Sequence, residues 1–556
     1  MAITAIPRTE EEPQGSGPGP TEPVDRAFLR WGVGIQLGVT ALLVAVVVVW
    51  VGRLTYALDD AAIHLSMADR LAHDGTWGVV AGRFESASSS PLWTALTAVG
   101  VLVAGPAAEW VPLILNVVAG VAVVWLLAQG QQVVRPGRSR PLDVAVTAVL
   151  VVGMLYLPGL ALVGMEHTLH TALVLAAVVT VHRWALDRPG PGPVAACAIV
   201  ALASLTRFET AFVVVGLAAA LVLVDRRRLT RRAAALLVSS AVPIAAFSLF
   251  NRAMGGGWLP NSLLAKGQGT GTAQSDGLTP SDIVGRVASD PLLIVLVASA
   301  AVYLIVRGRP GPALVPALAL VVATAFHVTL ADVGWYERYQ AYLIGVGVYF
   351  LLATVAELPA ATARRALVAI GAVGVVAAIP KLQHTVMVPR AADDMYRQQY
   401  QAGEFLGRYY DGEPVATDQL GYISYLHDGP LTDFAGLGDY EVLQRREGSR
   451  NRELWLTLDE ERGFDVVVVY DISGAFNAPR GWVRAGQWQI DGPATTGVTR
   501  TLVFYATDPE AVAPLQEHLA EFEPDMAPRS ELILNENAPM HAMAVDADET
   551  DAAASG

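Results

Sequence analysis

Residues 31–64 read WGVGIQLGVTALLVAVVVVWVGRLTYALDDAAIH, an apolar run that ends in a polar loop with two adjacent acids. The apolar part, residues 31–52, is close to the roughly 20 residues that a helix needs to cross a bilayer. Asp59 and Asp60 follow at the mouth of this span, where two carboxylates are costly to desolvate and therefore indicate a function. A carboxylate in a cleft at the membrane edge has a chemical use, because it accepts the proton of an attacking hydroxyl group.

The composition extends the membrane assignment to most of the chain. Of 556 residues, 53% are hydrophobic and 16% are charged, and the mean hydropathy is +0.42, which lies outside the range of ordinary soluble proteins. The lone cysteine, Cys197, excludes a disulfide framework and a cysteine-based metal site. The net charge of −14 and the lack of a basic stripe exclude a nucleic-acid partner.

Apolar segments recur up to about residue 380 and predict a polytopic α-helical membrane protein with about 11–12 transmembrane helices. In chain order these segments are 31–52, 91–106, 110–134, 142–163, 168–186, 193–206, 210–224, 233–250, 291–306, 311–330, 338–357 and 365–381.

The pattern divides the chain into four regions. Tails rich in Pro, Gly or acids without apolar periodicity predict disorder, and short Val-rich runs late in the chain predict buried strands of an α/β domain. The regions are a disordered cytoplasmic tail at 1–30, a transmembrane domain at 31–384 with its first outer loop at 53–90, an extracytoplasmic α/β domain at 385–524, and a disordered acidic tail at 525–556. The strands are expected at 413–418, 465–470 and 501–505.

Arginine placement predicts the orientation of this multi-pass protein in the cell membrane. Arginines cluster in alternate short loops, which places those loops in the cytoplasm and the C-terminal domain outside, with the N-terminus inside. The clusters lie at 135–140, 183–188, 226–232, 307–309 and 364–365. One conflict remains, because residues 91–134 resemble two spans but must cross an odd number of times. Either 91–106 is a re-entrant or interfacial helix, or one boundary is misplaced.

Helix capping is the alternative account of the acidic pair. Ile63, Met67 and Leu71 have the spacing of an amphipathic helix lying along the interface. Asp59 would then cap this helix and Asp60 would lie in its first turn, an arrangement that the helix dipole favours by about 0.3–1 kcal/mol. Capping is compatible with catalysis, since a capped acid is held rigidly.

The predicted outer loops carry isolated polar residues between apolar spans. Any one of them could be a snorkelling or ion-paired side chain. Together they form an acidic and basic ring at one membrane face, which suits an anionic lipid headgroup because a cation neutralises a phosphate leaving group. The candidate residues for donor-phosphate or substrate binding are Glu166, His167, Arg207, Asn261, Lys266, Tyr336 and Arg338.

Several of these motifs resemble those of one glycosyltransferase superfamily. Asp59-Asp60, the turn at Gly75 and Phe84-Glu-Ser-Ala-Ser-Ser-Ser-Pro-Leu-Trp93 are similar to the first outer loop of GT-C glycosyltransferases, in particular of mycobacterial-type arabinofuranosyltransferases. The similarity continues in scattered blocks to about residue 440. Further matching blocks are Gly164-Met-Glu-His167, Leu205-Thr-Arg-Phe-Glu209, Trp258-Leu-Pro-Asn-Ser262 with Ala265-Lys266, Trp335-Tyr-Glu-Arg-Tyr339, Thr417-Asp-Gln-Leu-Gly-Tyr422 and Leu431-Thr-Asp-Phe-Ala-Gly-Leu437. Ala61-Ala62 and Phe208-Glu209 depart from the family pattern, which puts the donor sugar in doubt more than the reaction.

The resemblance implies a polyprenyl-phosphate-linked sugar as donor and an outer-face glycan, glycolipid or protein as acceptor. Asp59 or Asp60 would be the general base, and Arg207, Lys266 and Arg338 would hold the donor phosphate. No third oxygen ligand near the pair is identifiable by spacing, so no metal ligand is assigned and a divalent-metal requirement stays open. The alternatives are a secondary transporter, whose charges usually lie near the bilayer midplane, and a polytopic membrane protein without catalysis.

Overall fold

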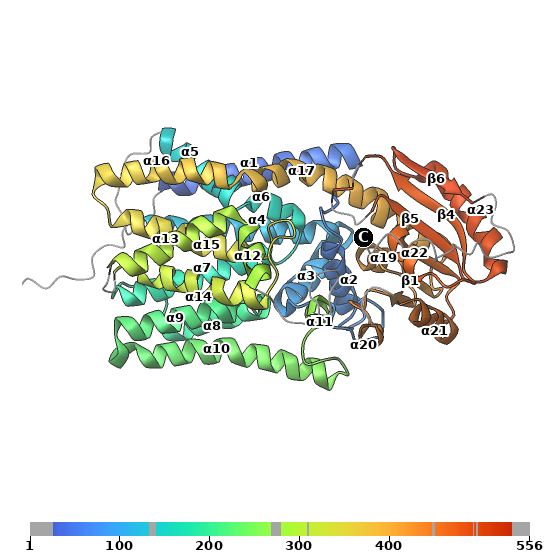
Figure 1. The fold of residues 1–556 in the computed structure, drawn as a ribbon, viewed down its shortest axis with the longest axis horizontal. Coiled ribbons are helices and arrows are strands. Elements are labelled where there is room, and N and C mark those ends of the chain that lie inside the picture. The colour runs from blue at the N-terminus through green and yellow to red at the C-terminus, as the bar shows by residue number, and fades with distance from the viewer. Residues whose placement is uncertain are drawn as a thin grey trace, which may run out of the picture.

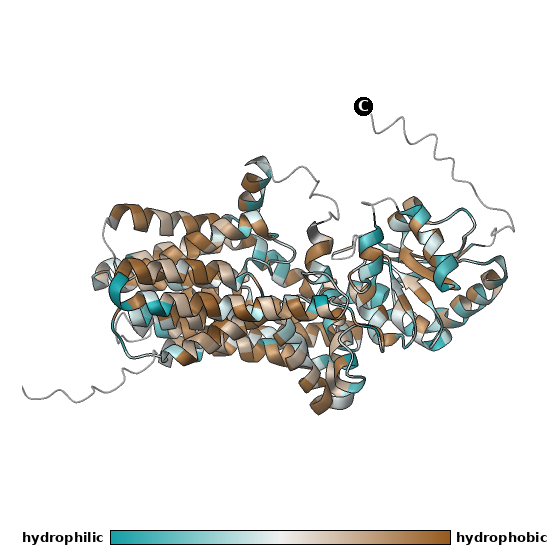
Figure 2. Ribbon diagram, turned by 90° about the horizontal axis from the view of Figure 1, so that it is seen from below, coloured by the Kyte–Doolittle hydropathy of each residue, from teal (hydrophilic) through white to brown (hydrophobic). Residues whose placement is uncertain are grey.

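The computed structural model of the chain describes residues 26–132, 141–267, 280–307, 311–446, 451–492, 494–495 and 499–535. A long helical bundle leads into a smaller α/β part at one of its ends (Figure 1). Apolar residues dominate the helices of the bundle, whereas polar and apolar residues alternate along the α/β part (Figure 2). Large apolar side chains such as Val49, Val118 and Val242 are exposed on the bundle, as on a membrane domain.

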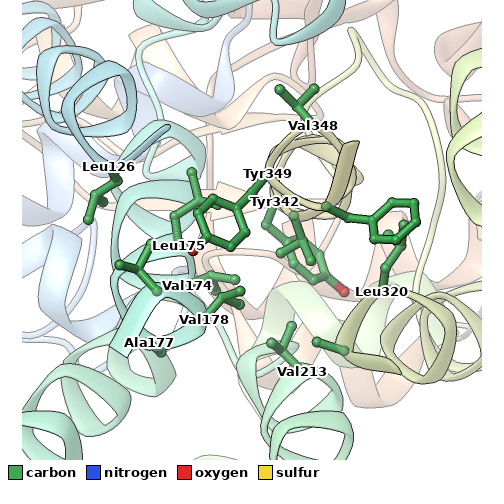
Figure 3. Packing of buried hydrophobic residues seen from close by; sticks show 14 of the residues in the cluster. Leu126, Val174, Leu175, Ala177, Val178, Val213, Leu320, Tyr342, Val348 and Tyr349 are labelled. Atoms are coloured by element: carbon green, nitrogen blue, oxygen red, sulfur yellow. The ribbon is translucent and has the colours of Figure 1, made fainter. Parts of the chain in front are cut away.

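The bundle helices form where the apolar runs were expected, because a backbone in lipid must satisfy its hydrogen bonds within the helix. Side chains from several helices meet in one large core, for example Leu126, Leu175, Val213, Leu320 and Tyr342 (Figure 3). The helices are α1 (Arg26–Val51), α4 (Val111–Gln132), α5 (Pro141–Ala148), η2 (Val149–Met154), α6 (Leu157–Val163), α7 (His167–Ala185), α8 (Pro193–Thr206), α9 (Thr210–Val224), α10 (Arg226–Ala253), α13 (Pro291–Arg307), α14 (Leu314–Leu330), α15 (Ala341–Ala356) and α16 (Ala360–Ala377).

The polytopic helical class is confirmed, while the expected number of spans stays a prediction. Among the described residues, 4 helices are long and apolar enough to cross a membrane, or up to 6 if each of two bent pairs is one span. Shorter apolar helices of 10–17 residues accompany them. The 4 long helices are Phe28–Val51, Pro91–Gln129, Ala145–Val163 and Arg226–Ala253; the bent pairs are Ser281–Ala288 with Pro291–Val306, and Ala361–Ala377 with Ile379–Tyr409.

Short helices lie between the bundle and the α/β part. They include α2 (Asp60–His73), α3 (Pro91–Ala104), η1 (Gly105–Trp110), α11 (Asn261–Gly267) and α12 (Pro280–Ala288). Helix α3 lies beside α2 at the end of the bundle (Figure 1), and Pro91–Gln129 together make one candidate span. The two alternatives for residues 91–106 therefore stay predictions.

The α/β part is reached through one nearly continuous helical path, α17 (Ile379–Met395), η3 (Tyr396–Tyr400) and α18 (Gln401–Tyr409). Its six-stranded sheet has the order β2-β1-β3-β5-β4-β6. Strand β1 is parallel to β2 and β3, and the other pairings are antiparallel. The strands are β1 (Val415–Thr417), β2 (Leu431–Asp433), β3 (Val466–Tyr470), β4 (Val483–Ile490), β5 (Thr501–Ala506) and β6 (Ser530–Leu534); the helices are α19 (Leu420–Leu426), α20 (Tyr440–Arg445), α21 (Arg452–Arg462), α22 (Asp471–Asn477), η4 (Pro509–Ala511), α23 (Val512–Phe522) and η5 (Glu523–Asp525).

The predicted inner boundaries of both tails, at residues 30 and 525, are wrong. Strand β6 pairs with β4 from Ser530 to Leu534, so the prediction of disorder is wrong for residues 525–535. Leu532 and Leu534 pack against the core of the sheet, which explains why this strand is ordered. Residues 26–30 likewise belong to α1. Residues 1–25 and 536–556 lie outside the described residues.

Candidate active site

Asp59 is held by the α/β part rather than by its own helix. The side chain makes no capping bond to α2. Its carboxylate instead accepts hydrogen bonds from the backbone amides of Gly421 (2.7 Å) and Tyr422 (2.9 Å). These are the second and third residues of α19, whose first amides have no partner within the helix. Asp59 thus occupies the N-cap position of α2, and Asp60 lies in its first turn as the capping account predicts, but the side chain of Asp59 caps α19 instead.

The surroundings of Asp59 change its acidity. Burial raises its pKa to about 6; the two amide hydrogen bonds oppose the rise, and the charges of Asp60 and Asp433 add to it. Burial also raises the pKa of Asp418 to about 6, at the end of β1 close by. Acidic groups therefore gather where the carboxyl ends of the parallel strands meet the first loop.

Asp60 is the more exposed of the two acids, and it forms an ion pair with an arginine. Arg338 donates from its Nη1 to Asp60 Oδ2 at 3.1 Å and from its Nη2 to the Tyr339 hydroxyl at 3.0 Å. The Arg338 side chain is only 3% exposed, whereas that of Asp60 is 36% exposed. The Arg338 Nε is buried and has no hydrogen-bond partner among the described residues. A buried guanidinium therefore faces an accessible carboxylate.

A second buried arginine lies between two glutamates. Arg207 donates to Glu166 at 2.6 Å and to Glu209 at 2.5 Å. Burial alone would raise the pKa of Glu209, but the charge and hydrogen bond of Arg207 outweigh it and lower that pKa to about 2. His64 Nε2 lies 3.5 Å from the other Glu166 oxygen, and burial lowers the pKa of His64 despite this carboxylate. With His64 neutral, this cluster holds one cation and two anions.

Of the other predicted residues, His167 lies in this cluster and Tyr336 contacts a histidine beside it. His167 Nε2 lies 3.8 Å from Glu166, and its ring meets that of Tyr339 edge to face. Tyr336 stacks on His384, with a ring-centroid distance of 5.1 Å.

Asn261 belongs to the contact that joins α11 to the first loop and the α/β part. It donates to Glu85 at 3.0 Å and to the Leu437 carbonyl at 3.2 Å. Lys266 lies in α11, but its side chain is outside the described residues.

The structure thus joins Asp60 to Arg338, and Glu166 to Arg207 and His167, while Asn261 contacts the wall of the first loop instead. His64 and Glu85 contact two of the predicted residues, Glu166 and Asn261, but they were not predicted as site residues from the sequence. His64 follows Asp60 by four residues, the spacing of one helix face, and this was the available signal. Glu85 stands inside the quoted first-loop motif. Within the described ranges, no three His, Cys, Asp or Glu side chains group as metal ligands do.

Comparison with known proteins agrees with this architecture. A family model described as a domain of unknown function (DUF8728) matches residues 391–505. No curated protein matches the chain in sequence. The crystal structure of ArnT from Cupriavidus metallidurans bound to undecaprenyl phosphate is similar, with a TM-score of 0.51 and 12% identity, and the match covers 87% of this chain and 99% of ArnT.

The archaeal oligosaccharyltransferase AglB from Archaeoglobus fulgidus, in complex with an inhibitory peptide and a dolichol-phosphate, is similar with a TM-score of 0.50 and 13% identity. That match covers 92% of this chain and 77% of AglB. At such identities the likeness concerns the fold, and the similarity to arabinofuranosyltransferases stays a prediction. The chain therefore shares the fold of these two structures and has the predicted architecture, a helical membrane bundle with a C-terminal α/β domain.

Proposed function

We propose that this protein is a membrane glycosyltransferase that moves a sugar from a polyprenyl-phosphate donor to a hydroxyl group of a glycan, glycolipid or protein. The observation that carries the proposal is the Asp60–Arg338 pair at the domain end of the bundle. It joins a partly exposed carboxylate, which suits a general base, to a buried guanidinium, which suits a phosphate. The likeness to structures that hold undecaprenyl phosphate and dolichol-phosphate supports a lipid-linked donor.

Asp60 is the proposed general base. Both oxygens of Asp59 accept backbone amides of α19, so a proton taken up there would disturb the contact between the loop and the domain. Asp60 suits the role better, since its side chain is 36% exposed and its bond to Arg338 can be exchanged for a bond to phosphate. Asp59 is proposed to hold the α/β domain in place beside the reacting groups.

The donor phosphate is proposed to compete with Asp60 for Arg338. The donor phosphodiester shares one negative charge between two oxygens, and a guanidinium can bind both of them in a bidentate pair, whereas the bond to Asp60 uses one nitrogen. Once Arg338 turns to the phosphate, the Asp60 oxygen that it leaves can accept a hydrogen bond from the acceptor hydroxyl. Binding of the donor thereby makes Asp60 available as the general base.

The bond changes then balance. The acceptor oxygen attacks the anomeric carbon, its proton passes to Asp60, and the bond from the anomeric carbon to the phosphate oxygen breaks. Polyprenyl phosphate leaves with the bonding electrons, and Arg338 stabilises its added negative charge. Inversion at the anomeric carbon is expected from the resemblance to the superfamily. Glu166, His167, Arg207, Asn261, Lys266 and Tyr336 are proposed to line the donor and acceptor positions.

The domain end of the bundle is proposed to face the outside of the cell. The basic start of α10, Arg226–Arg232, lies at the opposite end of the bundle (Figure 1). Basic loops favour the cytoplasmic side. A location of the polar groups at one end also fits a transferase better than a transporter, whose charged groups lie near the midplane.

Transfer of radiolabelled sugar from polyprenyl-phosphate donors by the purified protein in lipid vesicles tests the proposal. Asp60→Asn is expected to lower kcat by about 10²–10⁴-fold, the usual value of a general base. Asp69→Asn, an acid on the exposed side of the same helix, is the matched control and is expected to leave kcat unchanged. Full transfer by Asp60→Asn would exclude the proposed base. Absence of transfer together with uptake of solute into the vesicles would indicate a transporter.

A further inference from the structure

The backbone just before Arg338 has an unusual left-handed conformation. Gly334, Trp335, Tyr336 and Glu337 have successive φ angles of 91°, 45°, 61° and 62°. Only glycine adopts such angles without strain, and bulky L-residues do so rarely. A strained turn of this kind persists where its surroundings determine it, and such turns gather at functional sites.

A buried polar network holds this turn. Gln340 accepts a hydrogen bond from the backbone amide of Gly334 at 2.9 Å and donates to Glu337 at 3.0 Å and to Asp290 at 3.0 Å. Lys381 binds Asp290 at 3.0 Å and also pairs with Glu337. The network thus fixes both ends of the turn, at Gly334 and at Glu337.

The members lie in α17 or directly before α13 and α15, and they are almost inaccessible to solvent. Lys381 is 2% exposed, Asp290 3% and Gln340 1%. The second oxygen of Asp290 accepts the amides of Leu292 and Leu293 at the start of α13. The turn is therefore tied to α13 through Asp290, to α17 through Lys381, and to the start of α15 through Gln340.

We infer that Lys381 is a positioning residue that holds the left-handed turn and thereby directs Arg338 at Asp60 and at the donor phosphate. Arg338 follows Glu337 directly, so the direction of its side chain depends on the backbone that Lys381 and Glu337 fix. A more ordinary right-handed turn would point the guanidinium elsewhere. The inference rests on the proposed function for the phosphate, while the part that concerns the turn stands independently of it.

A matched control exists on the same helical path. Arg397 in η3 is also 2% exposed and also binds two carboxylates, those of Asp393 and Asp394. Its carboxylate partners differ from those of Lys381, although the charge of Asp394 acts on the Tyr336 hydroxyl. Lys381→Met and Arg397→Met therefore remove equivalent buried cations, and only the first removes one from the network around Glu337.

The first measurement is hydrogen exchange of the Gly334 amide in the detergent-purified full chain. Lys381→Met is expected to raise its exchange rate at least about tenfold, since an opened turn loses the bond to Gln340. Arg397→Met is expected to leave this rate within about threefold of the wild type, and Lys381→Arg is expected to restore it. This measurement requires no transferase activity, so it separates failure of the turn from failure of the proposed function.

The second measurement is the kinetics of sugar transfer. Lys381→Met is expected to raise KM for the donor about tenfold or more and to leave KM for the acceptor unchanged. Should Lys381→Met not fold, Glu337→Gln replaces it in both measurements, because it keeps the shape and weakens the same ion pair. Unchanged exchange and unchanged donor KM would overturn the inference. Faster exchange with an unchanged donor KM would overturn the positioning role and leave a structural one.

Discussion

Arg338 combines two properties that make its chemistry testable at the level of one side chain. It is buried, and its two terminal nitrogens go to different partners, Asp60 and Tyr339. A planar guanidinium holds two partners at fixed angles, which the point charge of lysine does not do. Its replacement should therefore affect phosphate binding even when the charge is kept.

Arg338→Lys is expected to weaken binding of polyprenyl phosphate about 10–100-fold, since a hydrogen bond to a charged group contributes about 1.5–3 kcal/mol. Binding to the protein in detergent is measured by isothermal titration with a short-chain polyprenyl phosphate. Arg53→Lys, at a partly exposed arginine paired with Glu109, is the control and should bind as the wild type does. Equal affinity of Arg338→Lys and the wild type would remove Arg338 from the phosphate site.

Asp59 gives a prediction for pH, and its sign follows from the direction of the shift. The pKa is raised from 3.8 to about 6 in the folded protein, so folding takes up a proton between these values. The stabilisation from this proton is complete below the unfolded pKa and is lost as the pH rises through about 6. The melting temperature of the wild type minus that of Asp59→Asn should therefore be larger at about pH 5 than at about pH 7.5. Asp418 has a similar shift but is present in both proteins, so it cancels. A difference that is the same at both pH values would contradict the assigned burial of Asp59.

At the scale of elements, the contact between α2 and α19 depends on a glycine. A Cβ atom added to Gly421 would overlap the main chain and the carboxylate of Asp59. Gly421→Ala is therefore expected to separate α19 from the first loop. The cost should be about 1–3 kcal/mol, the usual range for overpacking.

Thermal melting and sugar transfer measure this effect. We expect Gly421→Ala to lower both the melting temperature and kcat, because the first loop loses its contact with the domain. Gly481→Ala in the same domain is the control, since a Cβ there meets no atom within 4 Å. Equal behaviour of the two variants would show that the α2–α19 contact is unimportant.

The sequence predicts some elements far better than others, for physical reasons. Strands β1 and β3 are buried on both faces, so they appear as continuous apolar runs. Strand β6 alternates in burial and carries Glu531, and its signal resembles that of a polar tail. The bundle helices are predictable because lipid demands long apolar runs, but their boundaries and number of crossings depend on packing.

The residues of the candidate site also differ in how well the sequence predicts them. The acidic pair is visible in the sequence, because carboxylates after a membrane span are conspicuous. Arg338 is also visible as a candidate, but the pairings are not, since Arg338 lies 278 residues from Asp60 and Gly421 lies 362 residues from Asp59. Lys381 was not predicted as a site residue, because it stands at the end of an apolar segment and resembles a residue at a helix boundary. Left-handed backbone at Trp335 and Tyr336 has no local sequence signal, because both residues ordinarily avoid it.

At the scale of the whole molecule, the orientation in the membrane is open to direct test. In a Cys197→Ser background, a cysteine at Glu521 in the α/β domain should react with a membrane-impermeant maleimide in intact cells. A cysteine at Arg227, at the other end of the bundle, should react only after the membrane is opened (Figure 1). Both side chains are exposed, so access to the reagent depends on the side of the membrane. The reverse pattern would invert the proposed orientation.

The bond from Asp59 to Gly421 also has a consequence for biosynthesis. The two residues are 362 positions apart, and at about 5–20 residues per second the ribosome needs roughly 20–70 s to pass from one to the other. During that time the first loop has left the membrane without the helix that it caps. The nascent chain therefore carries Asp59 at the bilayer edge without its amide partners until its last quarter is made, and a chain interrupted before that point holds the reacting groups without the element that orders them.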